Sequence, residues 1–188
     1  MAQLNSDEMA KKFFGLASIN GILAVLFTVP ILDPGLCIAT PPGLFGCKST
    51  MDVNWPGTWV LVAWIVFVLV GVAGMVFWGS MYYFRGKMTP LQNVNKAFGW
   101  LHLIFYEAGV IGATGLMAAI GYVGGSALAQ GYGAPIAAEW IATKIIPPLS
   151  SDPTSVLNDM PPVVEAIFIG VTILGALIGF LSLWRMKS

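Results

Sequence analysis

Three side chains in the apolar run from Ala97 to Val123 are of types that do chemistry inside a membrane: His102, Tyr106 and Glu107. A carboxylate at bilayer depth is costly, and such residues usually face a bundle interior or a water-filled cavity. His102 is the only histidine of the chain. These side chains are therefore the first candidates for function.

Their spacing limits how they can cooperate. His102 and Tyr106 are four residues apart, so they share a helix face with Gly99 and Gly109. Glu107 is about 140° further round the helix from His102 and about 7 to 8 Å deeper. The two do not form one direct dyad. Polar packing against a neighbouring span or subunit is the favoured interpretation; a water-assisted proton path and contact with a ligand such as a quinone head group are the alternatives.

A single histidine also excludes much cofactor chemistry. A bis-histidine haem, a copper site with two or three histidines and a di-iron carboxylate site all need more histidine than the chain has. A His-Met haem would require His102 to face one of Met75, Met81 or Met117. The span of His102 has no cysteine, and no serine in a sequence motif typical of a nucleophile. No glycine-rich phosphate-binding loop is present either. We predict no catalytic residue, no metal site and no cofactor bound by this chain alone.

The composition identifies the elements that carry these residues. Of 188 residues, 57% are hydrophobic and 10% are charged, against about 25% charged in soluble domains. Four apolar stretches are long enough to cross a hydrocarbon core, which takes about 20 helical residues. They lie near residues 13–32, 58–84, 97–123 and 162–184. We predict an all-α integral membrane protein, with a single four-span domain over residues 1–188.

The distribution of lysine and arginine predicts the orientation. One side of the spans carries most of the positive charge, and the positive-inside rule assigns that side to the cytoplasm. The residues on this side are Lys11, Lys12, Arg85, Lys87, Lys96, Arg185 and Lys187. We therefore expect a multi-pass protein of the cell membrane with both termini in the cytoplasm and two extracytoplasmic loops.

The first of these loops contains both cysteines, Cys37 and Cys47. Thiols outside the cytoplasm tend to be oxidised, and no third cysteine competes, so the sequence predicts a disulfide. A pair of metal thiolates is the alternative. In the second loop, prolines bracket a predicted interfacial helix near residues 135–146. A polar return loop is expected over residues 149–161.

Small residues recur at helical spacing in three of the spans. Such residues let helices approach closely, and we expect them to pack against spans of this chain and of other subunits. The positions are Gly71, Gly74, Gly109, Gly112, Gly175 and Gly179. The net charge is zero and no basic tract exists, so lipid and other integral membrane subunits are the expected partners and nucleic acid is not.

One part of the third span resembles a known family. The residues are Ala97-Phe98-Gly99-Trp100-Leu101-His102, then Gly109-Val110 and Gly112-Ala113, and finally Gly121-Tyr122-Val123-Gly124-Gly125. This pattern resembles a late transmembrane segment of haem-copper oxidase catalytic subunits, especially archaeal ones. The paired haem and copper histidines of that family are absent, so no ligand role is carried over. The short charged N-terminus and the glycine- and tryptophan-rich spans are similar to accessory membrane subunits of archaeal respiratory chains.

The resemblance implies a non-catalytic integral subunit of a multi-subunit membrane oxidoreductase, such as a terminal oxidase or a related electron-transfer complex. It would scaffold partner subunits that carry haem and copper. The alternatives are a structural or adhesion-type four-span protein that acts through its outer loops, an accessory subunit of a membrane monooxygenase, and a small transporter. A transporter is disfavoured because the spans hold few polar groups and no inverted repeat.

Overall fold

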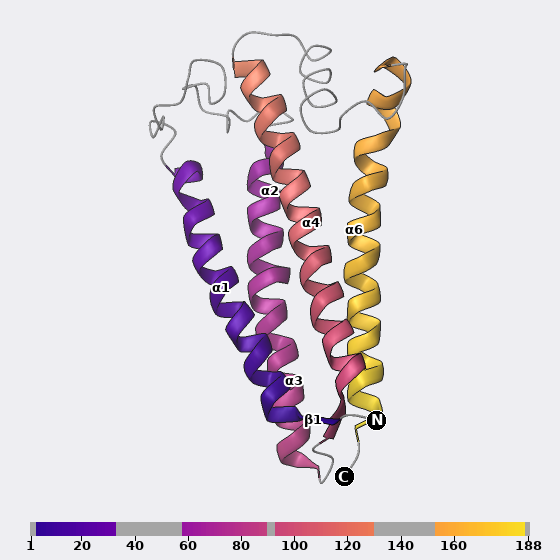
Figure 1. The fold of residues 1–188 in the computed structure, drawn as a ribbon. Helices are drawn as coiled ribbons and strands as arrows, with labels where there is room; N and C mark the ends of the chain where they lie inside the picture. The colour runs from indigo at the N-terminus through magenta and orange to yellow at the C-terminus, as the bar shows by residue number, and fades with distance from the viewer. Residues whose placement is uncertain (1–2, 33–57, 90–92, 130–152, 187–188) are drawn as a thin grey trace. The chain divides into compact units, whose positions relative to one another are not determined.

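The structure, a computed structural model, describes residues 3–32, 58–89, 93–129 and 153–186 (Figure 1). These residues contain four long apolar helical segments, with stretches of 20 to 30 residues suited to crossing a membrane. The predicted all-α membrane fold is confirmed. The segments are α1 (Ser6–Leu32), the continuous α2 (Thr58–Val66), η1 (Phe67–Ala73) and α3 (Gly74–Met88), α4 (Lys96–Ala129), and α6 (Pro153–Trp184).

The first helix begins earlier than the apolar pattern predicts. α1 starts at Ser6, ahead of the expected Phe13. The side-chain oxygen of Asn5 accepts a hydrogen bond from the backbone N–H of Asp7 at 2.9 Å, which satisfies one of the free donors of the first turn. Asp7 and Glu8 in that turn also favour the positive end of the helix dipole. Capping and charge thus extend the helix beyond its apolar stretch.

Two short strands precede α1 and α4, and the sequence pattern did not predict them. β1 (Gln3–Asn5) pairs antiparallel with β2 (Asn93–Asn95), with Leu4 opposite Val94. We call this pair the clasp. Asn95 mirrors Asn5, since its side-chain oxygen accepts the N–H of Ala97 at 3.0 Å at the start of α4. The clasp therefore joins the starts of α1 and α4.

The last helix corrects one expectation. α6 begins at Pro153, so the polar return loop predicted over residues 149–161 is helical over its second part. Proline suits the first position of a helix, because its missing N–H would have no partner there and its φ is already helical. The predicted interfacial helix near residues 135–146 and both cysteines lie outside the described residues.

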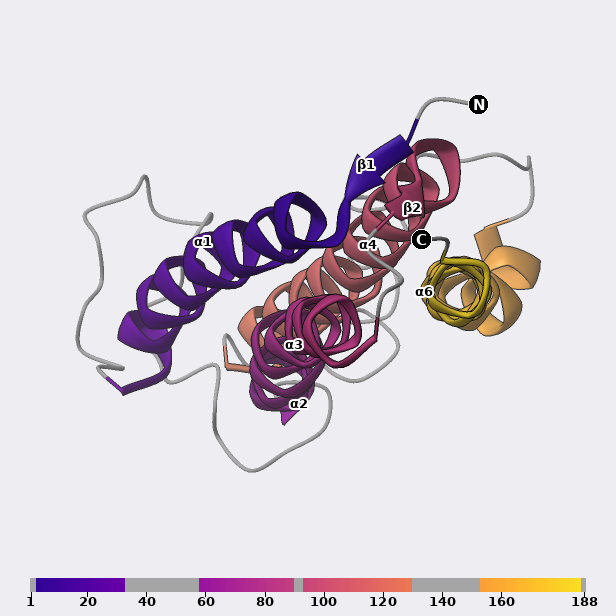
Figure 2. The ribbon, with the colours of Figure 1, turned by 90° about the horizontal axis from the view of Figure 1, so that it is seen from below.

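The chain divides into two compact units, residues 1–24, 66–112 and 167–188 in the first and 25–65 and 113–166 in the second. The first unit holds a continuous core, and Figure 2 shows β1 beside β2 at the start of α4. Its largest fully buried side chains include Met9, Phe13, Met75, Tyr82 and His102. In the second unit, a Cβ added at Gly121 would lie 2.7 Å from the backbone nitrogen of Val60, so α2 and α4 approach closely there.

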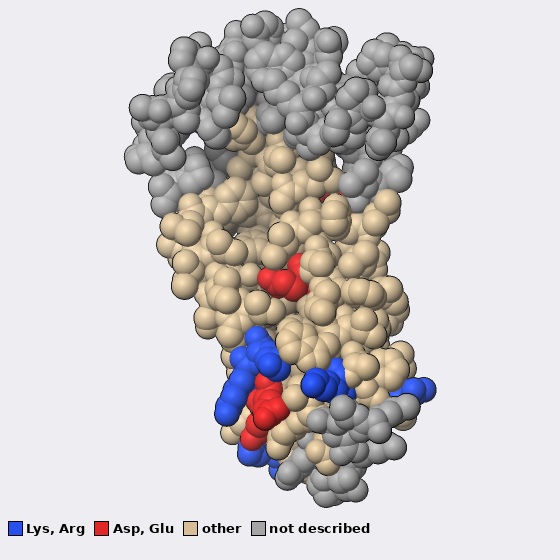
Figure 3. Space-filling model, in the orientation of Figure 1, with Lys and Arg blue, Asp and Glu red and all other residues tan. Residues whose placement is uncertain are grey.

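Charged side chains of the first unit gather near the clasp (Figure 3). Lys87 pairs with Asp7 at 3.0 Å, and the Lys12 ammonium lies 4.9 Å from the centre of the Trp100 ring. The Arg85 Nε donates to the backbone oxygen of Leu183 at 3.1 Å. These contacts tie α1, α3, α4 and α6 together at one end of the unit.

Candidate functional site

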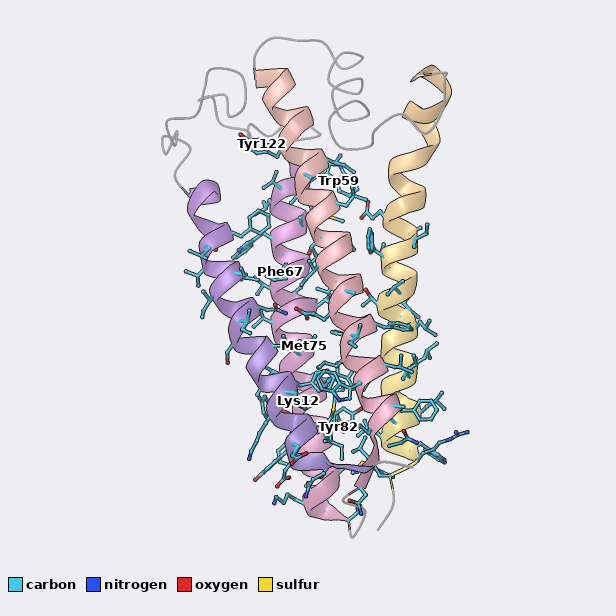
Figure 4. All side chains as sticks on the ribbon, in the orientation of Figure 1. Lys12, Trp59, Phe67, Met75, Tyr82 and Tyr122 are labelled. Carbon is cyan, nitrogen blue, oxygen red and sulfur yellow. The ribbon has the colours of Figure 1, made fainter. Side chains whose placement is uncertain are left out.

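His102 is held by a hydrogen bond from the neighbouring span. The Tyr82 hydroxyl of α3 lies 3.0 Å from His102 Nδ1 of α4. Both side chains are fully buried, and Figure 4 shows Tyr82 between the helices. The pair places a phenol and an imidazole in direct contact inside the protein.

Aromatic rings surround this histidine. The ring centres of Trp78, Phe13, Tyr82 and Tyr106 lie 4.5, 4.8, 5.8 and 6.0 Å from that of His102. We call these four rings the aromatic cage. Phe13 comes from α1, so three helices contribute to the cage. His102 Nε2 has no hydrogen-bond partner among the described residues, and it faces α6, where a Cβ added at Gly179 would lie 2.6 Å away. The His102 ring therefore packs directly against the backbone of Gly179.

Glu107 belongs to a separate polar cluster centred on Asn20 of α1. The Asn20 Nδ2 donates to the backbone oxygen of Gly71 at 2.9 Å and to Glu107 Oε2 at 3.1 Å. Asn20 is fully buried, and its Oδ1 has no partner in the described part of the chain. One amide thus joins α1, η1 and α4, while His102 bonds to α3 instead.

Tyr106 donates a hydrogen bond to a π-helical segment of the second span. In the π-helix η1, the N–H of Gly74 bonds to the oxygen of Leu69, five residues back. When the ladder returns to four-residue spacing, the next N–H pairs with Gly71, and the carbonyl of Val70 is passed over. The Tyr106 hydroxyl donates to this Val70 oxygen at 3.1 Å. The tyrosine supplies the donor that the π-helix removes.

Tyr106→Phe is therefore expected to destabilise the protein, because it leaves the half-buried Val70 carbonyl without that donor. The expected loss is about 1 to 3 kcal/mol, measured as a lower midpoint of thermal unfolding in detergent. Tyr83→Phe is the matched control, since Tyr83 is 42% exposed. Equal midpoints for the two variants would contradict the role given to Tyr106.

The six glycines singled out for packing all lie at close approaches in the first unit. A Cβ at Gly109 or Gly112 would collide with Thr172 or Phe168 of α6, and one at Gly175 or Gly179 with Tyr106 or His102 of α4. A Cβ at Gly71 would meet Phe67 and Val110, and one at Gly74 would meet the Tyr106 hydroxyl. These positions are occupied by helices of this chain.

Several residues of the site carried no prediction from the sequence. Asn20 was a visible signal, because it is a polar amide within the first apolar stretch. The sequence pattern indicates only apolar or interfacial positions for the aromatic residues Phe13, Trp78 and Tyr82. Their role depends on contacts between spans, such as the 20-residue separation of Tyr82 and His102, and no local periodicity reveals such contacts.

Among the described residues, no three His, Cys, Asp or Glu side chains come together in a group that could hold a metal ion. The chain matches no protein family, no curated protein and no solved structure. The resemblance of the third span to haem-copper oxidase subunits stays a prediction made from the sequence.

Proposed function

We propose that this four-span membrane protein is a non-catalytic integral subunit of a multi-subunit membrane oxidoreductase, a terminal oxidase or a related electron-transfer complex. The pair of hydrogen bonds made by Asn20 supports a non-catalytic role for this chain. They use the Glu107 carboxylate for packing between spans. The resemblance of residues 97–125 supports the type of complex.

The outward face of α6 suits a subunit that packs in a larger assembly. Its large apolar side chains point away from the core of the first unit, where lipid or helices of partner subunits would cover them. They are Ile167, Ile169, Ile173, Leu174, Leu177, Phe180, Leu181 and Trp184. Haem and copper would be held by those partner subunits.

Lys and Arg gather near the clasp, and this supports a cytoplasmic location for the clasp end of the helices. Both termini would then lie in the cytoplasm, and the protein would span the cell membrane. Polar packing is the role proposed for Glu107, His102 and Tyr106. A proton path through Glu107 is the competing role, because intramembrane carboxyl groups are common members of proton relays.

Two preparations test the proposed function. Mild detergent extraction from native membranes should copurify haem-bearing chains, identified by mass spectrometry together with a visible absorption band. The chain expressed alone should show no haem band, because one histidine cannot supply the common axial pairs.

A colourless homo-oligomer from native membranes would contradict the proposal and favour a structural or adhesion role. Copurifying chains with a copper-dependent oxygenase activity and no haem would favour a monooxygenase accessory subunit. A stoichiometric haem band in the isolated chain that His102→Ala removes would show that this chain is itself a cofactor subunit.

A further inference from the structure

We propose that Tyr82 and His102 form a proton-coupled redox pair. A one-electron oxidant withdraws an electron from the Tyr82 phenol, and the hydroxyl proton passes to His102 Nδ1 across the hydrogen bond of 3.0 Å. The products are a neutral tyrosyl radical, a histidine imidazolium and the oxidant reduced by one electron. Return of one electron to Tyr82 and of the proton to its oxygen restores the pair. This activity goes beyond scaffolding, and only the source of its oxidant rests on the proposed function.

The hydrogen bond provides the proton acceptor that phenol oxidation needs. A separation of about 2.6 to 3.2 Å between heavy atoms is within reach for proton transfer to a positioned base. The neutral tautomer that carries its proton on Nε2 leaves Nδ1 of His102 as that base. The hydroxyl of Ser182 is a second polar group near Tyr82, without hydrogen-bond geometry. As a much weaker base than imidazole, it leaves the proton to His102.

The surroundings restrict access to the pair. Tyr82 and His102 are fully buried, which keeps water and external reductants from the radical. Phe13 stacks on Tyr82 at 5.5 Å between ring centres and lies 4.8 Å from His102. Aromatic faces stabilise a neighbouring cation. Burial of a charge is costly, and the aromatic rings offset part of that cost for the imidazolium that the transfer forms.

Aromatic rings also connect the pair to the outside. The Trp78 ring lies 4.5 Å from that of His102 and 5.0 Å from that of Phe180 of α6. Phe180 is 55% exposed. An oxidised metal centre in a subunit packed against α6 is the class of oxidant that could draw an electron along this route.

Tyr106 is a natural control inside the same cage. It is buried too, but its hydroxyl donates to the Val70 carbonyl. A carbonyl oxygen does not take up the proton, so oxidation of Tyr106 lacks a base. Only Tyr82 should form a stabilised neutral radical.

The test uses the full chain in nanodiscs with a photogenerated ruthenium(III) tris-bipyridyl complex as oxidant. Tyr83, Tyr122 and Tyr132 are replaced by phenylalanine, which leaves Tyr82 and Tyr106 of the five tyrosines. Electron paramagnetic resonance should detect a neutral tyrosyl radical that forms more slowly in D₂O. Adding Tyr82→Phe should abolish most of this signal, and adding Tyr106→Phe should retain it. His102→Gln should greatly reduce the radical yield, because an amide is not a base.

A signal that survives Tyr82→Phe, or a yield unchanged by His102→Gln, would overturn the proposal. Equal rates of radical formation in H₂O and D₂O before any change at Tyr82 or His102 would overturn it as well, and this measurement does not require either variant to fold.

Discussion

Gly175→Ala should lower the thermal stability of the protein by about 1 to 3 kcal/mol, the usual range for forcing extra atoms into a packed interface. A Cβ at this position would lie 2.5 Å from the backbone nitrogen of Tyr106 and 2.9 Å from its Cα. Backbone atoms cannot rotate away as a side chain can. α6 and α4 must therefore separate, and His102 and Tyr106 would lose their packing against α6.

Gly170→Ala in the same helix is the matched control. Apart from the backbone of α6 itself, a Cβ there meets no atom of the described residues within 4 Å. Alanine is also a better helix former than glycine by about 0.8 to 1 kcal/mol. Thermal unfolding of both variants in the same detergent should give a lower midpoint for Gly175→Ala and an unchanged or higher one for Gly170→Ala. Two equal midpoints would contradict the close approach of α4 and α6.

Substitutions in the Asn20 cluster should cause the second large loss of stability. Asn20→Leu removes the side-chain donor to both the Gly71 oxygen and Glu107. The Gly71 carbonyl keeps its bond within the helix, so the main loss is at the half-buried Glu107 carboxyl, and we expect a cost of about 1 kcal/mol. Glu107→Leu should also assemble poorly, whereas Glu107→Gln keeps the shape and the acceptor for Asn20. We expect Glu107→Gln to support full assembly and turnover of the complex. Ser18→Ala is the control, because Ser18 is exposed and its hydroxyl donates within α1, to the Phe14 oxygen.

A double-mutant cycle between Asn20→Leu and Glu107→Leu measures the contact itself. Interhelical hydrogen bonds in membranes average about 0.6 kcal/mol and reach about 1.7 kcal/mol, so a coupling in this range supports polar packing. A Glu107→Gln variant that assembles normally and loses turnover or proton coupling would instead establish a proton path.

The sequence predicted the four spans because a hydrocarbon core selects for length and apolar composition, which are local properties. Glu107 and His102 were found for the same reason, since polar groups are conspicuous in apolar runs. The partners of these residues were not predictable, because Asn20 and Tyr82 reach them across 87 and 20 residues of chain.

Two irregular features could not be predicted from the sequence, for other reasons. The π-helix η1 is built from ordinary apolar residues, Phe67 to Ala73, and its shifted hydrogen bonds leave no periodicity that a pattern can reveal. The clasp is only three residues on each side, below the length at which strand alternation can be recognised. Both depend on groups supplied by distant parts of the chain.

The clasp also sets an order of events during synthesis. β1 leaves the ribosome before its partner β2, which follows 90 residues later, since Gln3 and Asn93 begin the two strands. At about 5 to 20 residues per second, this delay is roughly 5 to 20 seconds. During that interval α1 enters the membrane with Asn20 unable to reach Glu107, which has not yet been made. α1 therefore waits in the membrane without its polar partner, and a ribosome stalled before residue 93 would hold it in that state.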